Sequence, residues 1–313
     1  MTAAPPPAAA GAWRAHAAVL VAAVLFGTTF VVVRDAVAEA GVVPFLAVRF
    51  VVGAAVLAPF ALRRGAAAPG AGVGRAGAVC GLVLLAGYLL QTAGLRYTTA
   101  PVSAFVTYLL VVIVPLISAL VLHRRPRPAT LAGVAVAAAG LVLLTGEGAG
   151  PGRGELLTLG CAVAFAVHIV LLAELAPRFD TSALTAVQVL VVGAACLVPG
   201  AFLGGYRFPA RVWAAALFTG AAVSALAFAL QVWGQRRVGP TRTSLLLMLE
   251  PVVAAALGHA TGERLGARGV AGGLVILAGI VVAEVPLARR RRPPPPPVPA
   301  DPAGRGWPAG VEP

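Results

Sequence analysis

Long apolar runs separated by short connections dominate the chain from one end to the other. A helix needs about 20 mostly apolar residues to cross the hydrocarbon core of a bilayer. Ten runs meet that need: 15–33, 43–62, 77–95, 102–122, 129–145, 156–175, 183–203, 212–235, 243–260 and 267–287. Because the connections are short, neighbouring helices must run antiparallel. The pattern therefore predicts an all-α integral membrane protein with ten transmembrane helices.

Composition supports the bilayer as the main surroundings of this chain. Its 313 residues are 59% hydrophobic and 11% charged, with a mean hydropathy of +0.92, whereas about a quarter of the residues in a soluble domain are charged. A net charge of +13 is a feature of many nucleic-acid-binding proteins, but those gather basic side chains on one solvated face. Here the arginines lie between apolar runs, so we expect no nucleic-acid partner.

The two ends of the chain have a different composition from the apolar runs. Residues 1–14 are rich in Ala and Pro and lack the charged region and cleavage site of a signal peptide, so we expect a disordered N-terminus and a first run that stays in the membrane. Residues 288–313 hold an arginine cluster, Arg289 to Arg292, followed by a Pro-rich stretch that predicts a disordered tail. That cluster could bind anionic lipid, although a solvated cytoplasmic anchor explains it equally well.

The distribution of arginine predicts the orientation of the helices. Cytoplasmic connections carry an excess of Lys and Arg, and this sequence has no lysine. With the N-terminus in the cytoplasm, 16 arginines fall inside and 7 outside, and Arg49 lies within the second run. The outer set is Arg34, Arg96, Arg153, Arg207, Arg211, Arg264 and Arg268. We therefore expect a multi-pass protein of the cytoplasmic membrane with both termini in the cytoplasm.

Residues 15–146 and 155–287 resemble each other at a constant offset of 139 positions. The matched pairs include prolines and glycines, which recur less often by chance than alanine: Pro101 with Pro240, Gly133 with Gly272, and Gly140 with Gly279. Because each copy holds five runs, an odd number, the second must enter the membrane from the opposite side. The sequence thus predicts two inverted five-helix repeats, an arrangement typical of secondary transporters. We expect the glycine-bearing fifth helices to hold the halves together rather than line a pathway.

The order of short motifs across both halves resembles the EamA-type family of the drug/metabolite transporter superfamily. The motifs are Leu25 to Phe30, Arg49-Phe50, Gly87 to Thr92, Gly94 to Thr98 and Pro115 in the first half, and Phe165 to His168, Gln188, Gln231, Gln235 to Arg237, Leu249 to Pro251 and Gly262 to Arg264 in the second. The resemblance implies a ten-helix inverted-repeat transporter. The sequence departs from the family pattern at Phe26, where a tryptophan is common, and at 123–128, which lacks the glycine-glutamate pair found at Gly262-Glu263.

Two charged residues stand out inside the apolar runs, Arg49 in the second and Glu250 in the ninth. A central arginine or aspartate costs about 2.5–3.5 kcal/mol to insert, so such residues are candidates for function. One hypothesis is that Arg49 binds a substrate carboxylate or phosphate, or Glu250 in one conformation, while Glu250 binds a cationic group or a coupling proton. The alternatives are a permanent ion pair between them, a snorkelling Arg49, or a protonated Glu250 that caps backbone freed by Pro251.

Polar and aromatic neighbours in the apolar runs complete the predicted site. Gln188 occupies the repeat position of Arg49, so we expect the two to lie symmetrically about the centre. His168 and Tyr108 are equally compatible with helix packing. The full set of candidate substrate-binding or coupling residues is Arg49, Tyr88, Gln91, Tyr108, His168, Gln188, Gln231, Trp233 and Glu250.

The sequence favours a secondary transporter of a small polar metabolite, amino-acid-like or related, by efflux or exchange. A membrane enzyme is disfavoured because the chain has no metalloprotease or nucleophile-elbow motif and its histidines are dispersed. A non-transporting sensor or assembly factor is the other alternative. The three cysteines lie in apolar runs as packing residues, and we expect no cofactor and no metal. Proton coupling and assembly as a homodimer are hypotheses only.

Overall fold

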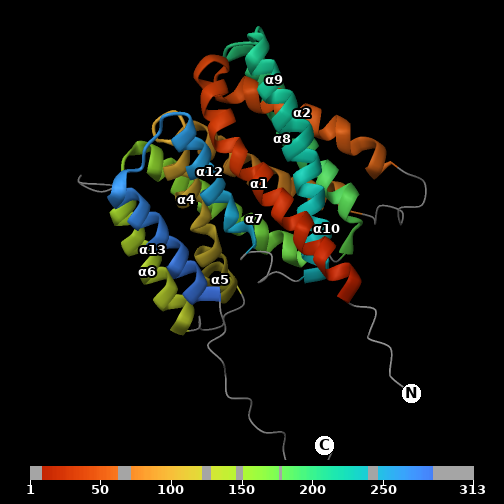
Figure 1. Cartoon of the computed structure of the whole chain (residues 1–313). Helices are drawn as coiled ribbons and strands as arrows, with labels where there is room; N and C mark the ends of the chain where they lie inside the picture. The colour runs from red at the N-terminus through yellow and green to blue at the C-terminus, as the bar shows by residue number, and fades with distance from the viewer. Residues whose placement is uncertain are drawn as a thin grey trace, which may run out of the picture.

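A bundle of helices makes up the part of the chain that the computed structural model describes, residues 9–62, 72–121, 128–145, 151–175, 178–238 and 246–284 (Figure 1). No strand occurs in these ranges. The helices are α1 (Ala9–Ala40), α2 (Val42–Ala61), α3 (Val73–Gly94), α4 (Ala100–Tyr108), α5 (Leu110–Val121), α6 (Pro128–Thr145), α7 (Arg153–Leu175), α8 (Thr181–Phe202), α9 (Ala210–Phe218), the π-helix η2 (Thr219–Ala227), α10 (Phe228–Val238), α12 (Leu249–Ala260) and α13 (Gly266–Glu284).

Eight helical segments in the described ranges are long and apolar enough to cross a membrane. They correspond to the first four, the sixth to eighth and the tenth of the predicted runs. The fifth and ninth runs appear as shorter apolar helices, Pro128–Leu144 and Leu249–Ala260. Residues 243–245, the start of the ninth run, lie outside the described residues, as do 1–8 and 285–313, which contain most of the predicted disordered ends.

The first helix is longer at both ends than the sequence pattern predicts. It includes residues 9–14, which we expected to be disordered, because the Ala-rich segment after the last N-terminal proline has high helix propensity. It also continues through the predicted connection 34–40, because that segment contains neither Pro nor Gly. Gly41 has φ of 74°, a conformation that glycine adopts easily, and α2 begins directly after it. The turn between the first two helices is therefore a single residue.

Three helices deviate from regular α geometry in their middle sections. A turn at Leu109 separates α4 from α5, and the amide of Val112 donates to the carbonyl oxygen of Leu109 at 3.0 Å, an i to i+3 bond. A second turn, at Met248, precedes α12. These two residues are separated by the repeat offset of 139. Residues Thr219–Ala227 form the π-helix η2, a rare conformation that occurs frequently at functional sites.

Contacts between the two halves follow a reciprocal pattern. The third helix of the first half, α3, packs against α7 and α8, the first and second helices of the second half; α1 and α2 in turn pack against the α9–η2–α10 segment. Helices α2 and α8 pack on each other, as do α6 and α13. The α2–α8 contact is fully buried and includes Leu46, Phe50, Val189 and Val192. Exchanging the two halves would leave this set of contacts unchanged.

Helices α6 and α13 lie side by side at one edge of the bundle (Figure 1) and meet through their glycines. A Cβ atom on Gly133 would lie 2.5 Å from the carbonyl oxygen of Gly279, and one on Gly140 would lie 2.9 Å from that of Gly272. Because Gly133 is opposite Gly279 and Gly140 is opposite Gly272, the two helices run antiparallel. Small residues allow this close backbone approach, which is the main source of helix association inside a bilayer.

We expect Gly140→Ala to destabilise the protein, although alanine normally favours a helix over glycine by about 1 kcal/mol. The added methyl group would meet the backbone nitrogen of Ile276 at 2.6 Å, and overpacking of this kind costs about 1–3 kcal/mol. Thermal unfolding of the purified protein in detergent measures the change. Gly74→Ala is the matched control because a Cβ there meets nothing within 4 Å; equal unfolding temperatures for the two variants would contradict the close packing.

Candidate functional site

Arg49 on α2 is the most deeply buried cationic side chain in the described part of the chain, at 2% exposure. Its Nε donates a hydrogen bond of 3.0 Å to Oγ of Ser224 in η2. Gly220 allows η2 to approach, since a Cβ there would lie 2.6 Å from the backbone oxygen of Arg49. The π-helix therefore packs directly over the backbone of Arg49 and presents a hydroxyl to its side chain.

Aromatic rings surround the guanidinium group of Arg49. The Cζ atom lies 4.9 Å from the ring centroid of Tyr88 and 5.4 Å from that of Phe50. The ring of Tyr88 contacts Phe50 and Phe165 edge-on, with centroid distances of 4.7 and 5.2 Å. A desolvated cation over an aromatic face gains about 2 kcal/mol, so the rings offset part of the cost of burying this charge.

Glu250 lies in the first turn of α12, directly after the turn at Met248, and is partly buried. The backbone of α1 approaches it closely, because a Cβ on Gly27 would lie 2.7 Å from the carbonyl oxygen of Glu250. Its carboxylate is within electrostatic range of Tyr88 and Cys161. Among the three ion pairs found between described residues, none joins Glu250 to Arg49. In this conformation the two charges are therefore not a direct pair.

Two further polar groups lie at helix contacts near the middle of the bundle. Nε2 of Gln91 donates to Oγ1 of Thr107 at 3.2 Å, and Thr107 also hydrogen-bonds the thiol of Cys161. Nε2 of His168 lies 2.6 Å from Oε1 of Gln188, whose amide donates to the backbone oxygen of Leu184. His168 thus bridges α7 and α8, as the packing alternative for this residue predicts.

The remaining predicted site residues are more dispersed. Tyr108 is buried at 4% exposure, next to the turn at Leu109. Gln231 is partly buried on α10. Trp233 is 40% exposed and lines a surface groove with α1, so the structure does not bring it to the group around Arg49.

Ser224 and Cys161 contribute to the site but are absent from the set of residues predicted from the sequence. Serine and cysteine in an apolar run usually bond their own helix backbone or act as packing residues. Only the repeat offset offers a signal, because Gly81 and Gly220 are repeat partners that lie against the backbones of Gln188 and Arg49 respectively. That relation places η2, and therefore Ser224, beside Arg49.

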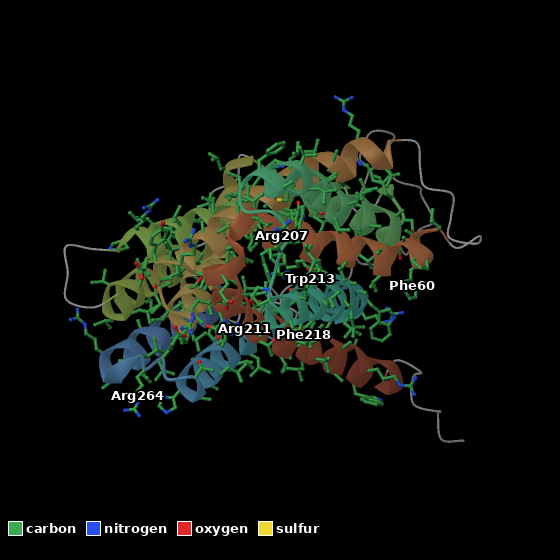
Figure 2. The ribbon with its side chains drawn as sticks, turned by 90° about the horizontal axis from the view of Figure 1, so that it is seen from above. Phe60, Arg207, Arg211, Trp213, Phe218 and Arg264 are labelled. Atoms are coloured by element: carbon green, nitrogen blue, oxygen red, sulfur yellow. The ribbon has the colours of Figure 1, made fainter. Side chains whose placement is uncertain are left out.

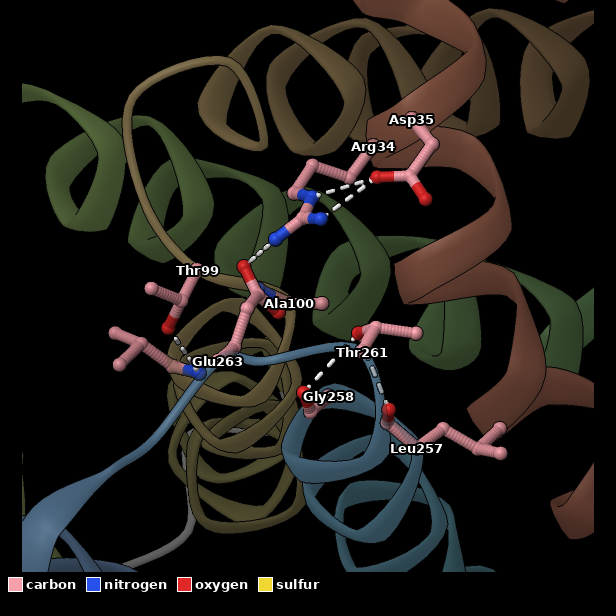
Figure 3. Close-up of polar contacts among 9 residues, drawn as sticks. Arg34, Asp35, Thr99, Ala100, Leu257, Gly258, Thr261 and Glu263 are labelled. Atoms are coloured by element: carbon pink, nitrogen blue, oxygen red, sulfur yellow. Dashed lines mark hydrogen bonds and ion pairs between the residues drawn. The ribbon is translucent and has the colours of Figure 1, made fainter.

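Charged residues of α1 and of the α12–α13 connection meet beside the start of α4 (Figure 3). The guanidinium of Arg34 pairs with Asp35 at 2.7 Å and with the carboxylate of Glu263. Glu263 also accepts hydrogen bonds of 3.1 and 3.3 Å from the amide of Ala100, at the start of α4. We call Arg34, Asp35, Ala100 and Glu263 the Glu263 network. One carboxylate thereby connects α1, α4 and the α12–α13 connection.

A cavity of about 840 Å³ adjoins the Glu263 network. Thr98, Arg96 and Glu155 line it as well, and the hydroxyl of Thr98 donates to Glu155. Farther out on the same end, Nε of Arg211 pairs with Glu39 at 2.7 Å. Viewed from above, Arg207 and Arg211 lie over the middle of the bundle and Arg264 lies at one edge (Figure 2). The whole end is rich in paired charges.

The ion pair of the Glu263 network is not repeated at the equivalent positions of the other repeat. The positions related to Arg34 and Glu263 by the offset of 139 are Ala173 and Arg124. An alanine cannot pair with an arginine, so these two positions cannot form the same ion pair. Among the described residues, no group of three His, Cys, Asp or Glu side chains could hold a metal ion.

Comparison with known proteins identifies the family. The EamA-like transporter family matches residues 13–146 and again residues 152–284. An uncharacterized transporter of Archaeoglobus fulgidus is 28% identical over 276 residues, covering 86% of this chain and 95% of its own. A second uncharacterized transporter of that organism is 32% identical over 152 residues, covering 49% of this chain and 46% of its own. A solved crystal structure superposes with a TM-score of 0.59 at 23% identity, covering 86% of this chain and 96% of that one, which shows a shared fold. Both halves of this multi-pass membrane protein match one family, as the motif resemblance predicts, and the chain therefore belongs to the EamA-like transporter family.

Proposed function

We propose that the protein is a secondary transporter of the cytoplasmic membrane that moves a small polar metabolite by alternating access. In this proposal ten helices cross the membrane as two inverted five-helix repeats, both termini are cytoplasmic, and transport is efflux or exchange. The observation that carries the proposal is the burial of Arg49, whose partners among the described residues are neutral: Ser224, Tyr88 and Phe50. A buried charge without a counter-ion is costly, and a substrate anion would supply one.

The packing of α6 on α13 supports the inverted arrangement. Repeat partners face each other crosswise, Gly133 against Gly279 and Gly140 against Gly272, so a two-fold rotation that exchanges the helices is perpendicular to both. If these helices cross the bilayer, that axis lies in the membrane plane. Such an axis relates inverted repeats, which alternate access by exchanging the conformations of the two halves.

Glu250 is the second charge of the proposed substrate site. It begins a helix directly after an interruption, and interrupted helices form many ion and substrate sites of secondary transporters. Tyr88 contacts the guanidinium of Arg49 and lies within electrostatic range of Glu250. A solute with a carboxylate and an amino group could therefore place its carboxylate at Arg49 and its amine toward Glu250. This geometry favours an amino-acid-like substrate.

The Glu263 network supports a gate on one side of this site. By the arginine distribution its residues face outward, and Glu263 joins α1 and α4 of the first half to the α12–α13 connection of the second. Helices α1, α4 and α12 contact one another. The conformation described here would thus be closed to the outside, which is the state needed to load a substrate from the cytoplasm.

We also propose that Glu250 exchanges a coupling proton. Glu250→Gln should then remove the response of transport to a pH gradient, because a carboxamide cannot exchange a proton. Efflux and uptake of a labelled panel of amino acids and other small polar metabolites in proteoliposomes, with and without the gradient, measure this. Glu174→Gln, which changes an exposed acid on α7, is the control and should respond as the wild type does. Transport that ignores the gradient in all three proteins would exclude Glu250 as the coupling group.

Arg49→Gln should lower kcat/KM for carboxylate-bearing solutes by about 10-fold to 100-fold, because a hydrogen bond to a charged group contributes about 1.5–3 kcal/mol. For Arg49→Lys, kcat/KM should lie between the values for the wild type and for Arg49→Gln, since lysine keeps the charge but loses the planar stacking on Tyr88. Arg207→Gln, at an exposed arginine, should transport normally. An equal loss for carboxylates and for the corresponding amines that lack the carboxylate would argue against an anion site at Arg49.

Glu263→Gln should open the outer side and raise, several-fold, the rate at which a membrane-impermeant maleimide labels Cys161 in intact cells. The glutamine side chain lacks the negative charge with which Glu263 pairs with Arg34. In the wild-type conformation Cys161 is fully buried, so labelling there reports opening. The assay uses Cys80→Ala and Cys196→Ala to leave one thiol. Glu39→Gln removes the peripheral pair with Arg211 and should leave labelling unchanged; equal labelling of the two variants would refute the gate.

A further inference from the structure

A surface groove of about 530 Å³ lies between the first part of α1 and the first half of α10. Small and aliphatic side chains and two tryptophans line it. The lining is Trp13, Arg14, Ala17, Ala18, Val21, Ala229, Leu230 and Trp233. With the exception of Arg14, none of these side chains is ionisable, so the groove is an apolar channel with a cation at one end.

Two arginines stack on the two tryptophans that line the groove. The Cζ atom of Arg237 lies 4.0 Å from the ring centroid of Trp233, and its NH1 group donates to the backbone oxygen of that residue at 2.8 Å. Arg14 lies over Trp13 at 5.6 Å. Both arginines are exposed, and neither forms an ion pair with an acidic side chain in the described part of the chain. The site therefore has uncompensated positive charge next to an apolar surface.

The repeat-related contact, between α3 and α7, has larger side chains than this groove. The positions equivalent to Ala17, Ala18 and Ala229 are Leu156, Leu157 and Leu90. At that contact Leu90 fills space, since its Cδ1 atom lies 3.4 Å from a Cβ built on Gly160, the residue equivalent to Val21. The position equivalent to Arg237 is Thr98, which hydrogen-bonds the acid Glu155. Ala229 thus leaves open the space that Leu90 occupies at the repeat-related contact.

We infer that this groove binds an anionic phospholipid of the cytoplasmic leaflet, with an acyl chain along the alanines and the phosphate between Arg14 and Arg237. The inference rests on the membrane orientation in the proposed function but not on transport. Tryptophan and arginine prefer the interfacial level of a bilayer, and basic side chains there attract anionic headgroups. Charge complementarity selects a lipid over an apolar protein partner, because a phosphate satisfies both arginines while its chain fills the apolar part.

The position of the groove gives the bound lipid a structural role. Helix α1 belongs to the first half and α10 to the second, and they approach closely beside the groove, where a Cβ on Gly234 would lie 2.9 Å from the backbone oxygen of Ala15. A lipid held by Arg14 and Arg237 would bridge the two halves at this contact. Anionic lipid should therefore stabilise the purified protein more than a zwitterionic lipid of equal chain length.

Native mass spectrometry of the full chain in detergent, titrated with phosphatidylglycerol or phosphatidylcholine of the same acyl composition, tests the site. We expect the first phosphatidylglycerol to bind at least five-fold more tightly than phosphatidylcholine. Arg14→Gln combined with Arg237→Gln should abolish that preference. Ala229→Leu, which copies the leucine of the other repeat, should weaken binding of both lipids.

Arg153→Gln is the matched control, because Arg153 is the repeat partner of Arg14 and stacks on Tyr97 at 4.4 Å in the filled copy. It should keep the preference for phosphatidylglycerol. Thermal unfolding in lipid-free detergent verifies that every variant is folded. The inference is overturned by equal binding of the two lipids to the wild type, by unchanged preference in the double variant, or by equal losses in the control and the double variant.

Discussion

Inside a bilayer every backbone amide and carbonyl must find a partner within the protein, and the rest of this structure depends on that constraint. It explains why the described chain consists of helices and of short turns between them. It also makes each departure from helical geometry expensive. The departures at Leu109, at Met248 and in η2 are therefore informative, because they occur beside polar side chains that a regular apolar bundle would not need. Ser224 lies within one of them and bonds the buried Arg49.

The sequence predicts much of this fold because hydrophobicity and helix length follow directly from the thickness of the membrane. It also points to Arg49 and Glu250, since the cost of burying a charge is evident from residue type alone. The ends of α1 are predicted less well, because polarity suggests a connection at 34–40 where only a glycine, Gly41, actually ends the helix. Charged residues at a helix end remain helical when they lie at the water interface.

Other features depend on which side of a helix faces which neighbour, and the sequence of a helix in lipid contains little of that information. Trp233 illustrates the difficulty: it is close in sequence to Gln231 but lies in the groove against α1. Ser224 shows the converse, because a hydroxyl in an apolar run gives no sign that it will meet an arginine 175 positions away. The repeat is the long-range signal in this sequence. Repeat-related glycines form both the contacts of α6 with α13 and the close approach of η2 to the backbone of Arg49.

Helix α1 has a mechanical consequence. Its 32 residues form one uninterrupted rod, about 48 Å long at 1.5 Å per residue. Arg14 lies near one end, Gly27 touches α12 at the middle, and Arg34 pairs with Glu263 near the other end. If the helix moved as a rigid body about its contact at Gly27, its two ends would move in opposite directions. Such a movement would link the Arg14 end to the ion pair of Arg34 with Glu263 through the helix itself rather than through a chain of side chains.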